Sequence, residues 1–227
     1  MPRIPKRLSD ECVVEQYRVI KMVLIKLGYS KEIEWQDSLD FDIVSETIFL
    51  RESAWVVLSS GMRETVVRRL FPAFSTCFFD WRSATRIAEN SSTCARKALS
   101  VFGHTGKVNA IIRIAERLEF EGFESLKNKI VDNSIQTLQS LPFVGPVTSF
   151  HLAKNLGLEV AKPDRHLVRI AAATGFSSTQ SLCEKIAEKT GDKISVVDLV
   201  LWRFATINPE YTDFFAEPSL RSTLAAA

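Results

Sequence analysis

The sequence predicts an all-α protein of about ten to twelve short helices, and three observations support this fold class. Apolar residues recur at steps of three and four along most of the chain, which is the spacing of one helix face. Alternation of apolar and polar residues over more than four positions, the pattern of a half-buried strand, is hard to find. The 227 residues include only 9 Gly and 8 Pro, too few for the many turns of an all-β protein.

The first two helices have clear sequence signals. The first is expected to begin at Ser9 or Asp10, both good N-cap residues, and to end at Gly28. Its apolar face is expected to carry Val13, Tyr17, Ile20, Leu24 and Leu27. A second helix is expected from Ser45 to Ser60, with an inward face of Ile48, Trp55 and Leu58.

Further helices follow from the same periodicity. They are expected at about 63–72, 83–89, 93–101, 107–120, 123–130, 134–140, after Gly145, and at 165–173, 179–189 and 195–207. The helix after Gly145 is marked by Leu152 and Leu156. Ser195 is expected to cap the last helix, with Asp198 three residues further on.

The composition is that of a globular protein and excludes several classes. Hydrophobic residues make up 46% and charged residues 25%. The four cysteines (Cys12, Cys77, Cys94, Cys183) are widely spaced, which argues against a structural zinc site, an iron–sulfur cluster and a disulfide scaffold. The basic start of the chain has no apolar stretch behind it, and no run of about 18 apolar residues occurs. We therefore expect neither a secretory signal nor a membrane span, and a cytoplasmic protein, associated with the nucleoid if bacterial.

The charges are unevenly distributed although the net charge is only +2. The stretch from Asp10 to Glu46 contains nine Asp and Glu but only four Lys and Arg. The stretch from Arg51 to Arg113 contains ten Lys and Arg but only four Asp and Glu. The second stretch fits either a solvated helical surface or a face that follows the phosphates of a nucleic acid. Charge alone leaves both interpretations open. The basic residues concerned are Arg63, Arg68, Arg69, Arg82, Arg86, Arg96, Lys97 and Lys107.

The most informative segment is 138–170. Apolar residues up to Leu141 end one amphipathic helix, and 142–146 forms a tight turn. Pro146 is expected at or near the first position of the next helix, where its missing N–H costs nothing. Free backbone N–H groups at that helix start, together with the helix dipole, suit one DNA phosphate. Asp164 is expected to begin a further helix.

This segment resembles the helix-hairpin-helix/Gly-Pro-Asp signature of the DNA glycosylase superfamily. That superfamily includes endonuclease III, the adenine and 8-oxoguanine glycosylases and the bacterial alkylation-repair glycosylase. The weaker likeness upstream places the helix before the base-pocket loop at 53–60 and the DNA-wedge loop at 103–107, and in all it covers about 45–208. The matching residues of the signature are Leu141, Pro142, Val144, Gly145, Thr148, Pro163, Asp164, His166, Leu167, Val168 and Arg169.

Three departures from the family pattern bear on the chemistry. Phe143 stands where the family usually has Gly, which predicts that the hairpin contacts DNA more hydrophobically. Val147 stands where bifunctional members have a nucleophilic Lys, and the C-terminal iron–sulfur cysteines of several members are missing. The resemblance therefore implies a monofunctional, cluster-free glycosylase, closer in chemistry to the alkylation-repair branch.

The resemblance also implies an architecture of two helical lobes with a cleft between them. The central helical domain is expected at 48–158, with the hairpin at about 134–156. The second lobe is expected to combine the chain ends, 1–47 and 159–227. Asp164 would lie at the mouth of the cleft.

The resemblance implies that Asp164 is the catalytic carboxylate. Such a group would stabilise the positive charge that builds on the sugar as the N-glycosidic bond is cleaved. The local sequence by itself favours Asp164 as the N-cap residue of a helix. One side chain can serve both as the cap and as the catalytic carboxylate. The hairpin residues expected to hold a phosphate are Phe143, Val144, Gly145, Val147 and Thr148. The candidates for the DNA wedge and base pocket are His104, Arg51, Trp55, Met62, Arg63, Lys162 and His166, each with a core or surface role as the alternative. Lys154 and Lys162 are expected to contact phosphates or to be exposed rather than to act as nucleophiles.

The function implied is that of a monofunctional glycosylase, expected as a monomer, that flips a damaged or modified base out of double-stranded DNA and leaves an abasic site. No cofactor is implied, apart from a monovalent cation at the hairpin that the resemblance leaves open. Two alternatives remain. One is a defence enzyme that excises modified pyrimidines from phage DNA; the other is a non-catalytic helix-hairpin-helix DNA-binding protein.

Overall fold

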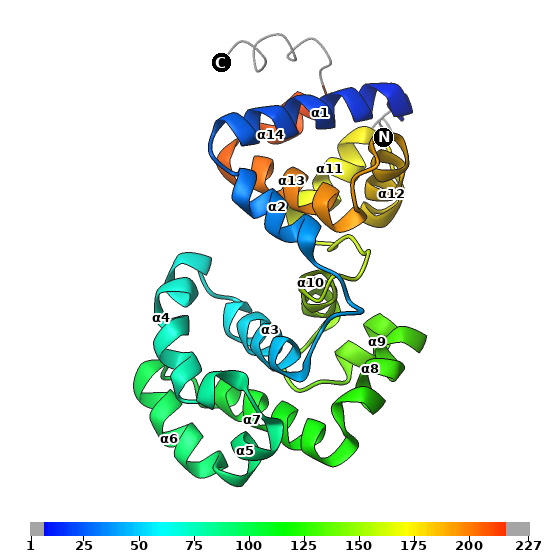
Figure 1. Cartoon of the computed structure of the whole chain (residues 1–227). Coiled ribbons are helices and arrows are strands. Elements are labelled where there is room, and N and C mark those ends of the chain that lie inside the picture. Colours follow the sequence, from blue (N-terminus) through cyan, green and yellow to red (C-terminus); the bar gives the residue numbers. More distant parts are fainter. Residues whose placement is uncertain (1–6, 217–227) are drawn as a thin grey trace, which may run out of the picture. The chain divides into compact units, whose positions relative to one another are not determined.

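A computed structural model describes residues 7–216 and shows helices joined by short loops, with no strand in that range (Figure 1). The all-α prediction is confirmed. The described residues form fourteen α-helices and one 3-10 turn, more than the ten to twelve expected. Within the same range, no helix is both long and apolar enough to cross a membrane.

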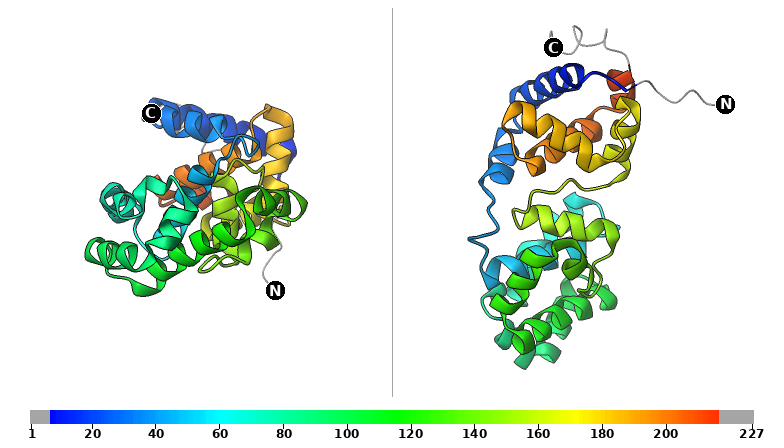
Figure 2. Two further views of the ribbon diagram at one scale, coloured as in Figure 1. Left: turned by 60° about the horizontal axis from the view of Figure 1, so that its bottom comes forward. Right: turned by 90° about the vertical axis from the view of Figure 1, so that its right-hand side faces the viewer.

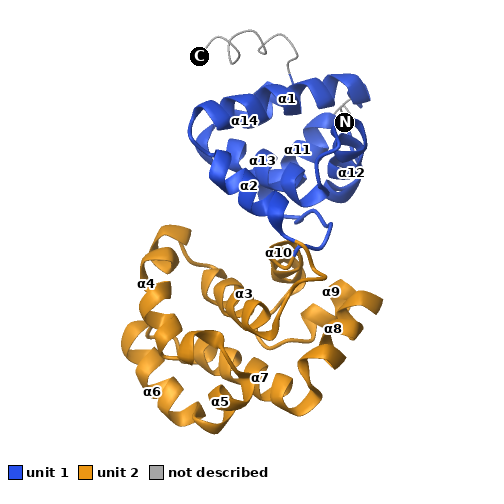
Figure 3. Cartoon of the chain, viewed as in Figure 1, with its two compact units in different colours: residues 1–39, 157–227 blue, residues 40–156 orange. Residues whose placement is uncertain are grey.

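The chain divides into two compact units, coloured separately in Figure 3. Unit 1 consists of residues 1–39 and 157–227, and unit 2 of residues 40–156. The helices of unit 1 are α1 (Asp10–Lys26), α2 (Ser30–Ser38), α11 (Arg165–Thr174), α12 (Thr179–Thr190), α13 (Ile194–Ile207) and α14 (Tyr211–Ala216). Those of unit 2 are α3 (Glu46–Ser59), α4 (Glu64–Thr76), the 3-10 turn η1 (Phe79–Trp81), α5 (Ala84–Glu89), α6 (Ser91–Val101), α7 (Thr105–Glu121), α8 (Phe123–Asp132), α9 (Ser134–Gln139) and α10 (Pro146–Asn155).

The first boundary between the units lies before residue 40 and not at 47–48. Phe41 and Val44 are buried, and the Lys127 ammonium donates hydrogen bonds to the carbonyl oxygens of Asp42 (2.7 Å) and Val44 (3.2 Å). These contacts attach the segment before α3 to α8 of unit 2. Residues 1–6 and 217–227 of the expected second lobe lie outside the described residues.

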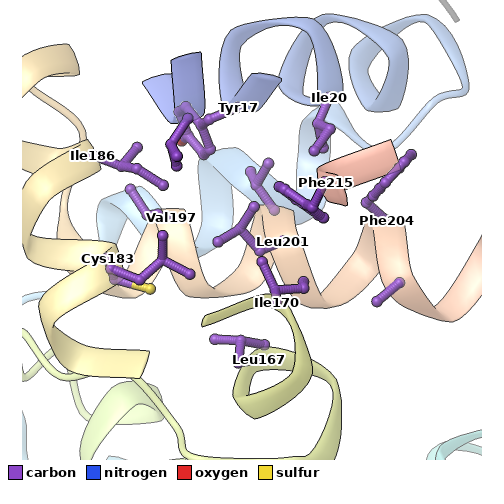
Figure 4. Close-up of a cluster of buried hydrophobic side chains, with 14 of the residues drawn as sticks. Tyr17, Ile20, Leu167, Ile170, Cys183, Ile186, Val197, Leu201, Phe204 and Phe215 are labelled. Carbon is purple, nitrogen blue, oxygen red and sulfur yellow. The ribbon is translucent and has the colours of Figure 1, made fainter. Parts of the chain in front are cut away.

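Unit 1 is built from both ends of the chain. Helix α1 packs against α12 and α13, and α2 packs against α13, as the blue and orange ribbons show in Figures 1 and 2. Figure 4 shows their side chains meeting in one cluster, in which Tyr17 and Ile20 of α1 face Val197 and Leu201 of α13. This core fixes the start of α11, where Asp164 lies.

The predicted Ser9 cap and the predicted helix start at Ser45 are both confirmed. The Ser9 hydroxyl accepts a hydrogen bond from the Cys12 amide at the start of α1, and the Ser45 hydroxyl accepts one from the Ile48 amide at the start of α3. Gly28, which follows α1, has a φ of +90°, a backbone conformation that favours glycine.

The predicted cap of α13 is wrong. Lys193 is the N-cap residue, and Ser195 lies inside the helix with only 1% of its surface exposed. The Ile194 amide donates instead to the Glu159 carboxylate at 2.6 Å, so a side chain 35 residues earlier satisfies the helix start. The Asp198 carboxylate accepts from the Lys162 amide at 2.7 Å rather than supporting a cap.

Helices α2 and α14 were not expected from the sequence. Helix α2 buries only Ile33 and Gln36, so its apolar periodicity is too weak to recognise. Helix α14 has six residues, too few to display a helical repeat, although Tyr211, Phe214 and Phe215 are all buried. In α3, Leu58 is buried as predicted, whereas Ile48 and Trp55 are half-buried.

Candidate functional site

The hairpin expected around 134–156 is formed by α9 and α10. The turn between them is closed by hydrogen bonds from the Leu141 amide to the Leu138 carbonyl and from the Val144 amide to the Leu141 carbonyl, both 3.1 Å. The Arg117 guanidinium of α7 donates to the Ser140 carbonyl (3.2 Å) and hydroxyl (2.8 Å), which ties the turn to the body of unit 2. Pro146 is the first residue of α10, as predicted.

The amide donors at the start of α10 differ from the expected set. The Val144 N–H is used within the turn, and the Gly145 N–H donates to the Thr148 hydroxyl at 2.6 Å. Pro146 has no N–H, and the first intrahelical bond is that of Ser149 to the Gly145 carbonyl. Helix geometry therefore leaves the N–H groups of Val147 and Thr148 for an incoming anion. Val144 and Gly145 are corrected from amide donors to residues that shape the turn.

Phe143 occupies an unusual backbone conformation in this turn. Its φ is +66°, in the left-handed region that glycine adopts freely and that costs a residue with a side chain about 1–2 kcal/mol. This conformation explains why glycine suits the position in the family that the hairpin resembles. The Phe143 side chain is 45% exposed, and a hydrophobic contact of this residue with DNA stays a prediction.

The loop before α7 contacts Phe143. His104 is the N-cap residue of α7, and its Nδ1 accepts a hydrogen bond from the Lys107 amide at 3.3 Å. The His104 ring stands edge-on to the Phe143 ring, with 5.9 Å between the centroids. Because His104 is exposed, its ring is available to a ligand, and its wedge role stays a prediction.

Lys107 is not part of a basic surface, contrary to one interpretation of the charge cluster. The residue is 3% exposed, and its ammonium donates to the carbonyl oxygens of Leu58 (2.7 Å) and Ser60 (2.6 Å) at the end of α3. Burial lowers the pKa of this ammonium. The other basic residues of the cluster are exposed: Arg63, Arg68, Arg69, Arg82, Arg86, Arg96 and Lys97.

Asp164 caps α11, as its local sequence predicts. Its Oδ1 accepts hydrogen bonds from the amides of His166 (2.9 Å) and Leu167 (3.0 Å). No hydrogen bond within residues 7–216 uses Oδ2, and the side chain is half-buried. One oxygen therefore holds the helix start while the other remains available for chemistry.

Two further candidates lie next to Asp164 in unit 1. The His166 ring is half-buried, stands edge-on to Tyr211 at 5.4 Å, and accepts at Nε2 from Arg165. Burial lowers the pKa of His166, opposed by the neighbouring Asp164 carboxylate, so the neutral imidazole is favoured. The Lys162 backbone is held by Asp198. Lys162, Asp164 and His166 thus lie next to one another in sequence at the start of α11.

The remaining pocket candidates belong to unit 2. Arg51 pairs with the neighbouring Glu52 carboxylate at 3.1 Å. Trp55 contacts Phe71 edge-on at 5.1 Å, and the Arg68 guanidinium lies 5.6 Å from its ring centroid. Met62 and Arg63 are exposed in the loop between α3 and α4. Roles in base recognition stay predictions for all four.

Lys154 is buried, with 6% of its surface exposed, so the expectation of a phosphate contact or an exposed position is wrong. Lys154 follows Val147 by two turns of α10, but Val147 is 42% exposed whereas Lys154 points into the protein. Burial also makes it a poor source of the amine that Val147 lacks.

A buried polar link between α3 and α10 was missed by the sequence analysis. The Glu52 carboxylate accepts a hydrogen bond from the Asn155 side chain at 3.0 Å, and both residues are almost fully buried. Burial raises the pKa of Glu52, and Arg51 and Asn155 partly oppose this rise. No local pattern connects residues 103 positions apart.

This link makes a pH-dependent prediction for Glu52→Gln. Because the pKa of Glu52 is raised in the folded state above its ordinary value of 4.5, its contribution to stability is present below that pH and is lost as the pH rises. The Gln side chain does not titrate. As the pH rises from 4 to 8, the free energy of unfolding of the variant should therefore increase relative to that of the parent protein. Urea unfolding at several pH values measures this change.

Glu121→Gln is the matched control, because hydrogen bonds from Lys129 and Arg117 lower the pKa of Glu121. The stability that Glu121 lends is present above its ordinary pKa and is lost as the pH falls. The control should lose stability relative to the parent over the same rise in pH. Equal slopes for the two variants would contradict the assignment of Glu52 as a carboxyl disfavoured by burial.

Among the residues that the structure describes, no three His, Cys, Asp or Glu side chains converge as metal ligands would. A monovalent cation at the hairpin would need carbonyl oxygens of the turn, and those of Leu141 and Gly145 already accept hydrogen bonds. The cation stays a prediction.

Two surface cavities in unit 1 are lined by other residues than Asp164, one beside Arg7 and Phe176 and the other beside Tyr17 and Asp192.

Comparison with known proteins identifies a similar fold. No protein-family model and no curated protein sequence matches the chain. Among solved structures, the chain is similar to the crystal structure of the Methanocaldococcus jannaschii 8-oxoguanine glycosylase/lyase in complex with a 15mer DNA containing 8-oxoguanine. The alignment covers 85% of this chain and 97% of that one, with a TM-score of 0.56 and 17% sequence identity. The likeness shows the fold, which agrees with the predicted all-α fold class.

Proposed function

We propose that this protein is a DNA glycosylase that extrudes a damaged or modified nucleotide from duplex DNA and hydrolyses its N-glycosidic bond. The observation that carries the proposal is the arrangement of Asp164, whose Oδ1 caps α11 while Oδ2 accepts no hydrogen bond within the described part of the chain. Asp164 follows the end of a hairpin by nine residues. The fold likeness to a protein named as an 8-oxoguanine glycosylase/lyase supports the proposal, although function depends on the site rather than the fold.

Unit 2 supplies the contact to the DNA backbone. The N–H groups of Val147 and Thr148 and the positive end of the α10 dipole bind one phosphate. This contact positions the protein on the duplex and carries no sequence information. Exposed arginine side chains of unit 2 add attraction to neighbouring phosphates, which makes binding weaken as the salt concentration rises.

Extrusion of the target nucleotide requires unstacking, which costs least for a damaged or weakly paired base. The exposed His104 ring at the start of α7 is suited to the space that the nucleotide leaves. Met62 and Arg63, exposed after α3, are candidates for contacts to the extruded base.

Unit 1 supplies the chemistry. As the bond between the sugar C1′ and the base nitrogen breaks, its electron pair leaves with the base and positive charge develops on the sugar. The ionised Asp164 carboxylate stabilises this charge and accepts at Oδ2 a proton from the water that attacks C1′. The departing base takes a proton from solvent, and an abasic sugar with a C1′ hydroxyl remains.

We favour hydrolysis over lyase chemistry because α10 offers no accessible amine, and Lys162 is the remaining candidate amine that borohydride trapping tests. A lyase needs an amine that attacks C1′ and forms a Schiff base, and Val147 has none. Lys154 on the same helix is buried. The strand should therefore stay intact.

The proposal is tested by measuring abasic-site formation on duplexes that each carry one alkylated, oxidised or otherwise modified base, and on genomic DNAs of phages with modified pyrimidines. Abasic sites on at least one substrate support a glycosylase and identify the base. Tight DNA binding with no abasic sites on any of them would instead support the non-catalytic DNA-binding alternative.

The hairpin gives a separate prediction for Gly145→Leu. Gly145 has ordinary extended backbone, and the nearest atom to a Cβ there would be the Thr148 hydroxyl oxygen at 3.8 Å, so a Cβ makes no clash. The added side chain should block a phosphate from the amides of α10. Because a hydrogen bond to a charged group contributes about 1.5–3 kcal/mol, affinity for every duplex should fall about tenfold or more.

Val131→Leu serves as the control for Gly145→Leu, since Val131 is exposed on α8 of the same unit. It should leave binding unchanged. A Gly145 variant that altered base preference while keeping its affinity would contradict the assignment of this turn to phosphate binding.

A further inference from the structure

We propose that Phe143 couples the hairpin turn to the loop 103–107, so that the phosphate-binding segment and the segment carrying His104 meet DNA as one rigid surface. This inference rests on the proposed function. It assigns Phe143 a positioning role, because the side chain acts on DNA through His104 and not on the bond that breaks.

The Phe143 ring lies against the loop at two points. Its edge-on contact with His104 has a centroid distance of 5.9 Å and an interplanar angle of 90°. A Cβ built on Gly106 would lie 3.6 Å from Phe143 Cε2 and 3.4 Å from His104 Cε1. The ring therefore rests over the first turn of α7, directly beside the imidazole.

Lys107 extends the same cluster to a third segment. Its ammonium lies 5.9 Å from the centroid of the Phe143 ring and donates to the carbonyl oxygens of Leu58 and Ser60 at the end of α3. Its backbone amide donates to His104 Nδ1. The hairpin turn, the loop 103–107 and the end of α3 are thus joined through Phe143, His104 and Lys107.

The backbone at Phe143 supports a role for the ring. Glycine would adopt the left-handed conformation without strain, whereas phenylalanine adopts it only against the steric preference of its Cβ. Strained backbone of this kind persists where the surrounding contacts hold it and often marks a functional position. Here the contacts that hold it are those to His104 and to the start of α7.

The consequence concerns how the protein recognises a gap in the base stack. A loop that is free to move loses entropy when it inserts into a duplex, whereas a loop already fixed by Phe143 has lost that entropy in the free protein. Phe143 should therefore strengthen binding to DNA with a gap and hardly affect binding to an intact duplex.

The test measures the affinity of the whole protein for two duplexes of one sequence, one intact and one with a tetrahydrofuran abasic-site analogue, by fluorescence anisotropy. The parent protein should bind the analogue duplex more tightly. Phe143→Gly, which removes the ring and the strain together, should lose about tenfold in affinity for the analogue duplex and less than twofold for the intact one.

Three further variants separate the contact from general effects. Phe143→Tyr retains the ring and should restore the preference for the analogue duplex. Phe120→Ala, at an exposed phenylalanine near the end of α7, should behave as the parent protein does. Because the two rings touch, His104→Ala should add little to the loss caused by Phe143→Gly when both are combined.

Each remaining outcome has a clear meaning. If the parent protein and Phe143→Gly prefer the analogue duplex to the same degree, the coupling is overturned and the proposed function stands. The same conclusion follows if Phe143→Gly loses equal affinity for both duplexes. Additive effects of the two substitutions would likewise overturn it. A parent protein that binds both duplexes equally would overturn nucleotide extrusion, and the coupling with it.

Discussion

Asp164→Asn is expected to lower the rate of base excision by about 10²–10³ while the protein stays folded, the effect of removing one group that stabilises transition-state charge. The amide retains an oxygen that accepts the two capping hydrogen bonds of His166 and Leu167, but it carries no negative charge to stabilise the sugar cation. Excision is measured under single-turnover conditions on a substrate identified from the panel of modified DNAs.

Stability and DNA binding should hardly change in this variant. Asn and Asp cap helices about equally well, so the loss should be about a few tenths of a kcal/mol. DNA affinity should hold or rise slightly, because one negative charge near the phosphates is removed. Near-normal excision by a folded Asp164→Asn protein would defeat the mechanism.

Ser178→Ala is a matched control for the loss of a cap. The Ser178 hydroxyl caps α12 in the same unit by accepting from the Ser181 amide at 3.0 Å. This substitution should cost about 1 kcal/mol of stability and leave excision unchanged. Together the two variants separate the chemistry of Asp164 from its capping role.

The second large effect is expected in borohydride trapping. The parent protein should produce alkali-labile abasic sites with neither a nick nor a covalent protein–DNA adduct, because Val147 has no amine. Val147→Lys should yield a trapped adduct, because bifunctional members of the family that the hairpin resembles have their nucleophilic Lys at this position. Val147 is 42% exposed in the first turn of α10, so a lysine fits there without repacking. Adducts are resolved by denaturing gel electrophoresis.

A strong adduct with the parent protein would contradict hydrolysis. The candidate for the attacking amine would then be Lys162, which lies two residues before Asp164. Lys162→Met then identifies the amine, because its loss should abolish the adduct. An adduct restricted to Val147→Lys would support both the position of Val147 and the absence of lyase chemistry in the parent protein.

Features determined by neighbouring residues could be predicted from the sequence. The hydroxyls of Ser9 and Ser45 each accept a hydrogen bond from an amide only three residues further on. The local sequence therefore sufficed to predict where α1 and α3 begin. Pro146 and Asp164 likewise begin their helices as the local sequence indicated. The all-α fold follows from such local signals repeated along the chain.

Features that depend on distant residues could not be predicted. The cap of α13 comes from Glu159, and the pattern around Ser195 gave no sign of this. Lys107 is charged and lies in a basic stretch, yet tertiary packing buries it against the end of α3. The departure at Phe143 was visible in the sequence, but its left-handed backbone and its contact with His104 require the folded turn.

The most direct test of the proposed function counts three products of one reaction. Free base is measured by mass spectrometry, abasic sites by an aldehyde-reactive probe, and strand breaks by gel electrophoresis, all on the same substrate DNA. We expect free base and abasic sites in equal amounts, strand breaks at background, and both products strongly reduced with Asp164→Asn. Strand breaks that rise in step with the abasic sites, or DNA that is bound without release of any base, would contradict a hydrolytic glycosylase.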